Sequence, residues 1–267
     1  MPIFGRSRGE RVRLPGSRAR FRPSFRTGAP YLVPLIVAGA TAAAAWHWRG
    51  PLLSYGSSLS LQAPETQVRQ ALANQTRAHL EDVYGFQSGG TLELVPVTFA
   101  EVVPVVEGNR ATVVAMLDAE GRAVWRDQAA QVSYVGREVF HMRPCSIALW
   151  CAEGDQFSRL RGVLRTLFRR TDALRARDPG AFATLVAEGY RDGAVDRAAL
   201  LARVGADMAR GEPADLRPTA WQIRVDRDGA EVGEDYQAAR PGELPTRQRG
   251  RYRLVRQGER WLFAAGL

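Results

Sequence analysis

The apolar positions divide the chain into one uninterrupted apolar run and a long stretch of periodic patterns. Residues 31–48 (YLVPLIVAGATAAAAWHW) carry no formal charge over 18 positions. At about 1.5 Å of rise per residue, a helix of that length spans ~27 Å, close to the ~30 Å hydrocarbon core of a bilayer. Tyr31 at one end and Trp46 and Trp48 at the other are placed like interfacial aromatic anchors. The run therefore predicts a single transmembrane helix.

The flanking charges predict how this helix is oriented. Residues 1–30 contain eight arginines and one glutamate, whereas residues 49–64 contain a single charge, Arg49. By the positive-inside rule, the leader stays in the cytoplasm, and the rest of the chain is exported across the inner membrane. The basic leader can also contact anionic lipid head groups. Two alternatives are a cleaved signal peptide, because Ala43–Ala45 resembles a cleavage site, and a buried soluble helix.

Behind this segment, the apolar positions follow two successive helix-then-strand series. Residues 49–64 are rich in Gly, Pro and Ser and are typical of a linker. In the first series, residues 65–145, the spacing predicts a helix to about residue 84. Valine-rich alternation over 91–142 then predicts an antiparallel meander. One helix followed by a meander is a compact α+β unit.

The second series, residues 155–267, repeats this order with more helices. A boundary is expected at 143–155. The long helix after it is predicted from an apolar stripe made of Phe157, Leu160, Leu164, Leu167, Phe168, Thr171 and Leu174. Short helices are expected over 180–188 and from the N-cap Asp196 to about residue 209. Four strands, the first two joined by the hairpin turn RDG, close the chain.

The closing hairpin, RYRLVRQGERWLFAAGL, has a strand, a Gly turn and an aromatic-containing last strand. With the long helix and two short helices before it, this order makes residues 155–267 resemble the SnoaL-like superfamily, also called the nuclear transport factor two-like fold. The resemblance implies a curved antiparallel sheet folded into a cone against the helices, with a pocket at its open end. Residues 65–142 are then a degenerate second copy or a cystatin-like variant.

The expected fold class is therefore α+β, with a single N-terminal transmembrane helix. One or two units of a helix and a curved antiparallel sheet, of the cystatin-like or cone type, follow it. Single-pass inner-membrane subunits of type IV secretion and conjugation systems carry an exported domain of this fold. The chain is similar to them in layout.

Charge and motifs narrow the expected partners. The net charge is +9, and the leader of residues 1–30 contributes 8 − 1 = +7, which leaves +2 for residues 31–267. The high pI thus reflects the leader and gives no indication of a nucleic-acid-binding domain. The sequence contains no phosphate-binding glycine loop, HExxH or CxxC motif, so we expect no cofactor and no metal.

The chain has two cysteines, Cys145 and Cys151. In an exported domain, a pair this close is a candidate disulfide, which would contribute about 2 kcal/mol for so short a loop. The alternative is two unpaired, buried thiols.

Alternation of side chains along the closing strands predicts which residues face the pocket. If Trp221 faces inward, the same parity places Glu234 and Tyr236 on that face, with Tyr252 from the next strand. Burial would raise the pKa of this carboxylate, as a general acid or base requires. Alternatively, Glu234 lies at the rim, solvated or paired with an arginine, or a bulge turns it outward. Tyr190 is a further candidate to line the pocket.

The opposite parity of the same strands is basic. Arg247, Arg249, Arg251 and Arg253 alternate there and predict an outer strip of positive charge. Such a strip can contact an acidic partner or lipid, or remain a solvated face.

These observations favour a membrane-anchored, noncatalytic protein whose exported domain binds a partner protein or an envelope component. We expect lipid contacts through the anchor and the leader, and another protein or a second copy as the partner. The competing class is an isomerase- or dehydratase-like enzyme that acts on a small apolar ligand. In that class Glu234 would be the acid–base group, in line with the enzymes of the superfamily.

Overall fold

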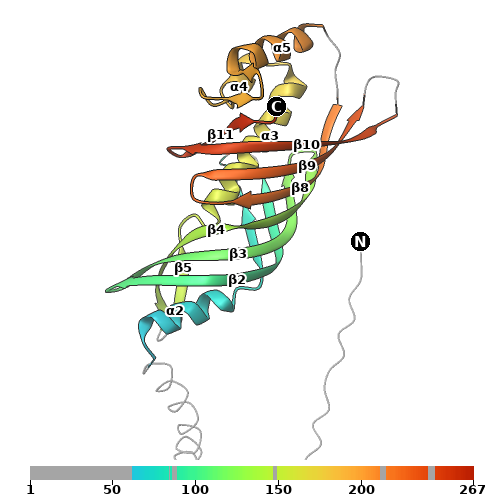
Figure 1. Cartoon of the computed structure of the whole chain (residues 1–267). Coiled ribbons are helices and arrows are strands. Elements are labelled where there is room, and N and C mark those ends of the chain that lie inside the picture. Colours follow the sequence, from blue (N-terminus) through green and yellow to red (C-terminus); the bar gives the residue numbers. More distant parts are fainter. Residues whose placement is uncertain (1–61, 84, 86–88, 147–148, 211–214, 240–243) are drawn as a thin grey trace, which may run out of the picture. The chain divides into compact units, whose positions relative to one another are not determined.

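The computed structural model describes residues 62–83, 85, 89–146, 149–210, 215–239 and 244–267, which fall in one compact unit (Figure 1). The predicted leader, the run 31–48 with Tyr31, Trp46 and Trp48, and nearly all of the linker lie outside the described residues. No helix in the described part is long and apolar enough to cross a membrane.

One curved, nine-stranded sheet organises the described residues (Figure 1). Its main path follows the order β1 (Ala78–Glu81), β2 (Thr91–Glu107), β3 (Arg110–Trp125), β4 (Gln128–Ser146), β8 (Asp215–Val225), β9 (Gly229–Ala239), β10 (Thr246–Gln257) and β11 (Arg260–Ala265). β5 (Leu149–Glu153) pairs with the end of β4. Only the β4–β8 pair in this sheet is parallel; the other described pairs are antiparallel.

The sheet joins the two helix-then-strand series, which the sequence had placed in separate units, 65–145 and 155–267. Residues 131–136 of β4 pair with residues 220–225 of β8. One buried cluster also runs from Val113 in β3 to Trp221 in β8. The expected boundary at 143–155 does not divide two cores, because β4 runs into it and β5 lies within it. The meander leaves one edge of β4 free, and β8 occupies that edge.

The long helix lies on one face of this sheet. α3 (Ser158–Ala176) passes behind β8–β10 in Figure 1 and contacts β4, β8 and β11. Its predicted stripe is buried as far as Thr171, including Leu160, Leu164 and Phe168, whereas Leu174 is half-buried. α2 (Pro64–Ala73), α4 (Pro179–Ala183) and α5 (Arg197–Ala209) are shorter. Asp196 caps α5 as expected, because its Oδ1 accepts a hydrogen bond from Ala199 N at 2.8 Å.

Two predicted helices end earlier than the sequence pattern suggested. The first stops at Ala73, and residues 78–81 form β1, in which Leu80 pairs with Leu92 of β2. The second, expected over 180–188, stops at Ala183, because the chain then bonds to β11 through Ala187 N and Phe263 O at 2.9 Å. In both places, strand pairing prevails over local helical spacing. A small hairpin, β6 (Arg191–Asp192) and β7 (Val195–Asp196), follows α4.

Candidate functional site

The inner face of β8–β10 carries the predicted candidate residues. Trp221, Glu234 and Tyr252 are all buried, as their strand parity predicted. The register pairs Trp221 with Glu234, and Glu234 with Gly250. The irregularity in β8 lies between Pro218 and Ala220, before these residues, so it does not turn Glu234 outward.

Glu234 accepts three hydrogen bonds in a buried polar cluster. Its donors are Arg170 Nη2 at 2.7 Å, Trp221 Nε1 at 2.9 Å and Tyr252 Oη at 2.7 Å. The residue is only 3% exposed, and the side chain of Arg170 is 5% exposed. Arg170 extends from α3, so the cluster ties the long helix to β8, β9 and β10. Pairing with an arginine was one of the alternatives for Glu234, but the pair lies in the core and not at the rim.

Two aromatic rings complete the surroundings of the Arg170 guanidinium. Its central carbon lies 4.6 Å from the centroid of the Tyr252 ring and 5.9 Å from that of Phe263. Burial lowers the pKa of Arg170, but the charge of Glu234 and the Tyr252 hydroxyl outweigh this effect, so that pKa is raised. For the Tyr252 hydroxyl, by contrast, burial itself raises the pKa well above its ordinary value. The cluster therefore holds a charged guanidinium and a protonated phenol.

A glycine makes the cluster possible. A Cβ at position 250 would lie 2.2 Å from Tyr252 Oη, closer than any real contact. Because Gly250 has no side chain, the Tyr252 ring can lie over it and its hydroxyl can reach Glu234. Such a tyrosine lying over a strand glycine covers backbone that the glycine would otherwise expose.

The predicted pocket residues do not come together around an open cavity. Tyr236 is half-buried, and its hydroxyl is hydrogen-bonded to Gln248 Oε1 at 2.8 Å. Tyr190 is buried in a second, smaller cluster, where its hydroxyl accepts from Leu267 N at 3.0 Å. Tyr252 borders a hollow that crosses β4 and β8–β10, but Glu234 lines neither this hollow nor a smaller one between α3 and α4.

Side chains fill the space beside Glu234 instead. The Phe168 ring packs edge-on against the Trp221 ring, with centroids 4.8 Å apart. Tyr252 packs in the same way on Phe263, at 5.6 Å. A reacting ligand would have to displace these rings from Glu234.

A second buried carboxylate, Glu138 on β4, was not predicted. It accepts hydrogen bonds from Tyr134 Oη at 2.8 Å and Leu160 N at 2.8 Å, and from Arg159 N at 3.2 Å. The last two donors belong to the first turn of α3, whose own N-cap residue, Phe157, provides no side-chain acceptor. Burial raises the pKa of Glu138, although these hydrogen bonds oppose the shift. Glu138 thus caps the long helix from the sheet.

The two cysteines have a structural role. Cys145 and Cys151 form a disulfide between β4 and β5. Among the described residues, no group of three or more His, Cys, Asp or Glu side chains could hold a metal ion.

Comparison with known proteins adds a fold likeness. No protein-family model matches the sequence, and no curated protein matches it. An NTF2-like protein of unknown function from Pseudomonas putida KT2440 is 16% identical, with a TM-score of 0.35, over 39% of this chain and 80% of that chain. A Nostoc punctiforme protein of unknown function with a cystatin-like fold is 10% identical, with a TM-score of 0.35, over 39% and 85%. The named folds are NTF2-like and cystatin-like.

These are the fold types that the sequence resembles. A function unknown protein from Mycobacterium tuberculosis also matches, with 18% identity and a TM-score of 0.36, over 40% of this chain and 69% of that chain. Other matching chains carry provisional names as a dehydratase and a ketosteroid isomerase.

Proposed function

We propose that the chain is a membrane-anchored, noncatalytic protein whose exported domain binds a partner protein or an envelope component, as an assembly subunit does. The observation that most supports a noncatalytic role is the environment of Glu234, the one candidate acid–base residue. Its carboxylate already accepts from Arg170, Trp221 and Tyr252, and aromatic rings fill the space beside it. A general base needs a substrate proton within hydrogen-bonding reach.

The alternative, an isomerase or dehydratase acting on a small apolar ligand, has less support. It rests on the inward placement of Glu234. Small-molecule sites are hollows that bury most of the ligand surface. The inner face of β8–β10 is packed at the point where such a hollow is required.

The proposed location rests on residues 31–48 and their arginine-rich leader. The anchor places the leader in the cytoplasm and the sheet domain on the other side of the inner membrane. The disulfide between Cys145 and Cys151 supports an exported domain, because disulfides persist in oxidising compartments.

Chemical cross-linking in native membranes, followed by mass spectrometry, tests the proposal directly. We expect the chain to sediment with membranes, to retain residues before Tyr31, and to yield specific cross-links from its sheet domain to another protein. A mature chain that begins near Trp46 would rule out the anchor. Cross-links confined to abundant bystanders would rule out the binding role.

A further inference from the structure

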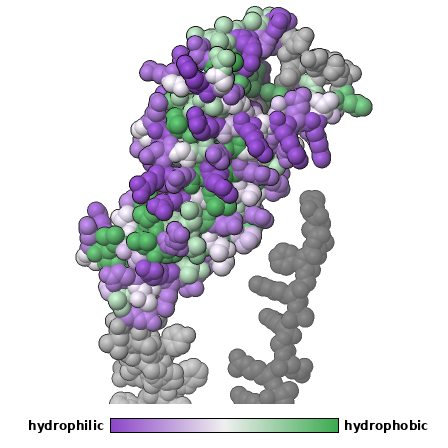
Figure 2. Space-filling view, viewed as in Figure 1, coloured by the Kyte–Doolittle hydropathy of each residue, from purple (hydrophilic) through white to green (hydrophobic). Residues whose placement is uncertain are grey.

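An apolar patch lies on the outer face of the sheet, where β2, β3 and β4 run side by side. Val103 and Val105 on β2 are 55% and 56% exposed. The strand register places Val114 of β3 beside Val103, and Val139 of β4 beside Val114. Both neighbours are half-buried, and so is Met116, one row further along β3. These five residues are called the apolar patch below; Figure 2 shows hydrophobic residues gathered over the lower strands.

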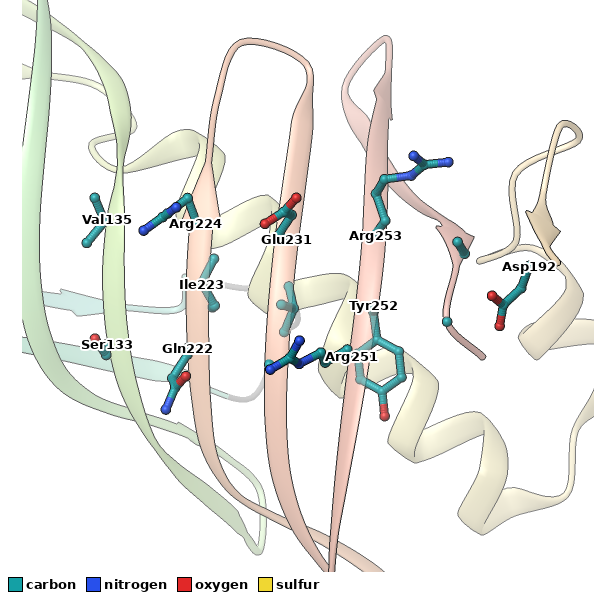
Figure 3. A pocket seen from close by; sticks show the side chains of 14 residues that line it. Ser133, Val135, Asp192, Gln222, Ile223, Arg224, Glu231, Arg251, Tyr252 and Arg253 are labelled. Carbon is teal, nitrogen blue, oxygen red and sulfur yellow. The ribbon is translucent and has the colours of Figure 1, made fainter.

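Large exposed apolar side chains are concentrated at the β2–β5 end of the domain. Among the described strands they occur on β2 and on β5, where Leu149 is 56% exposed, and on none of β8–β11. Outside the strands, Leu244 before β10 is exposed. Around the hollow at the other end of the outer face, charged residues of both signs gather instead, namely Arg224, Arg251, Arg253, Glu231 and Asp192 (Figure 3).

The chain enters the domain at the β2–β5 end. The first described helix, α2, contacts β2 and β5, and the described residues begin just before it, at Gln62. Residues 49–61 separate Gln62 from the predicted anchor, and a stretch of that length reaches at most ~45 Å even when fully extended. β2, with 17 residues, is itself about 55 Å long. An anchor at 31–48 would therefore hold this end of the domain close to the bilayer.

The apolar patch is bordered by charges of both signs. Glu101 pairs with Arg137 at 4.0 Å, and Arg143 pairs with Glu153 at 3.8 Å. An ionic partner finds no surplus of either sign to recognise. The patch also contains no tryptophan, tyrosine or arginine, the residues that anchor most tight protein interfaces. Its exposed valines offer a weak apolar contact, and a tether strengthens a weak contact by raising the effective concentration of the two surfaces.

The free edge of β2 limits the depth of such a contact. Beyond the pairing of residues 91–94 with β1, β3 is the only partner strand of β2 in the described part of the chain. The outer backbone groups of this edge need water, because unpaired groups are too costly in the hydrocarbon core of a bilayer. Pro104 and the register shift between Ala100 and Val103 interrupt the edge, which disfavours pairing with a strand of another protein.

We propose that the apolar patch rests on the surface of the bilayer in which the chain is anchored, on the exported side. Val103 and Val105 lie at the boundary between the head groups and the acyl chains, and the edge of β2 stays among the hydrated head groups. The opposite end of the domain, β8–β11, then points away from the membrane and is accessible to a protein partner. This inference rests on the anchor in the proposed function.

The test uses the full chain in nanodiscs of phosphatidylethanolamine and phosphatidylglycerol, loaded at one chain per disc. An environment-sensitive fluorophore is attached at Val103→Cys, at Val105→Cys and at the matched control Gln222→Cys, an exposed position on the outer face of β8. The native cysteines form a disulfide, so the introduced thiol takes the label. We expect a nitroxide near the glycerol end of the acyl chain to quench the probes at 103 and 105 at least about threefold more than the probe at 222. Unchanged thermal midpoints show that each variant folds.

Several results would overturn the inference. One is equal quenching at positions 105 and 222, and another is stronger quenching by a nitroxide at the far end of the acyl chain. Shielding of the probe at 105 only in discs that hold two chains would assign the patch to a second copy. If the chain stays in the discs but the probes at 103 and 105 are not quenched, this inference fails and the anchor stands. If the chain does not stay in the discs, the anchor itself fails.

Discussion

Replacing Glu234 by glutamine keeps the size of the side chain but removes its charge, so it tests whether the residue is structural. Arg170 would then retain a buried positive charge with no counterion. Breaking a buried pair in this way costs roughly 3–5 kcal/mol. The glutamine oxygen can still accept from Trp221 Nε1, and its amide can donate to the Tyr252 hydroxyl oxygen. We therefore expect the lower end, about 3 kcal/mol.

Urea unfolding of the full chain in micelles, followed by tryptophan fluorescence, measures this change. For a domain of this size the m-value is roughly 2–3 kcal/mol/M, so a loss of about 3 kcal/mol lowers the midpoint by roughly 1–1.5 M. The matched control is Glu231→Gln, which removes an exposed carboxylate from the other face of the same strand. It is expected to change stability by less than about 0.5 kcal/mol.

A double variant makes the reasoning refutable. Arg170→Met alone leaves the Glu234 carboxylate buried without its counterion. The double variant, Glu234→Gln with Arg170→Met, removes both charges and keeps a hydrogen-bonding partner for Trp221 and Tyr252. We expect the double variant to be more stable than either single variant. A cost below about 1 kcal/mol for Glu234→Gln, or losses that simply add in the double variant, would show that the pair does not hold the core together.

Three other predictions follow from buried and covalent contacts. Because burial raises the pKa of Glu138, the folded state binds its proton more tightly than the unfolded state. We therefore expect the stability of the wild-type chain, relative to that of Glu138→Gln, to be greatest below about pH 4.5 and to decline as the pH rises through the raised pKa. Urea unfolding at several pH values that showed the opposite trend would contradict this. Gly250→Ala drives a Cβ into the Tyr252 hydroxyl and is expected to lower the thermal midpoint by about 4 °C or more, whereas Gly229→Ala, with open space around it, should not. Replacing Cys145 and Cys151 together by serine is expected to cost about 2 kcal/mol, and thiol labelling of the unreduced, denatured wild-type chain should find no free thiol.

The sequence predicted what depends on local periodicity. The stripe of the long helix, the Asp196 cap and the inward parity of Trp221, Glu234 and Tyr252 all follow from spacings of 3.6 or 2 residues. The RDG turn is likewise local, and the structure joins β8 and β9 at this point. Each of these features is determined by neighbours within one or two turns of the chain.

Features that depend on distant pairing were missed. Nothing in the local pattern indicated that β4 pairs with β8, because that contact joins segments some 90 residues apart. The sequence pattern did not distinguish Arg170 from the other arginines of its helix. The available signal was its position, seven residues after Val163 and therefore on the same helical face. Glu138 could have been suspected from a carboxylate in an otherwise apolar strand parity.

Glycines on the inner face of the sheet make room for polar contacts of the core. Tyr134 lies over Gly136 and Tyr252 lies over Gly250, and their hydroxyls donate to Glu138 and Glu234. The charge of Arg170 depends on the same cluster, because its Nε and Nη1 are buried without a hydrogen-bond partner in the described part of the chain. Substitutions on the inner face should therefore act first on unfolding.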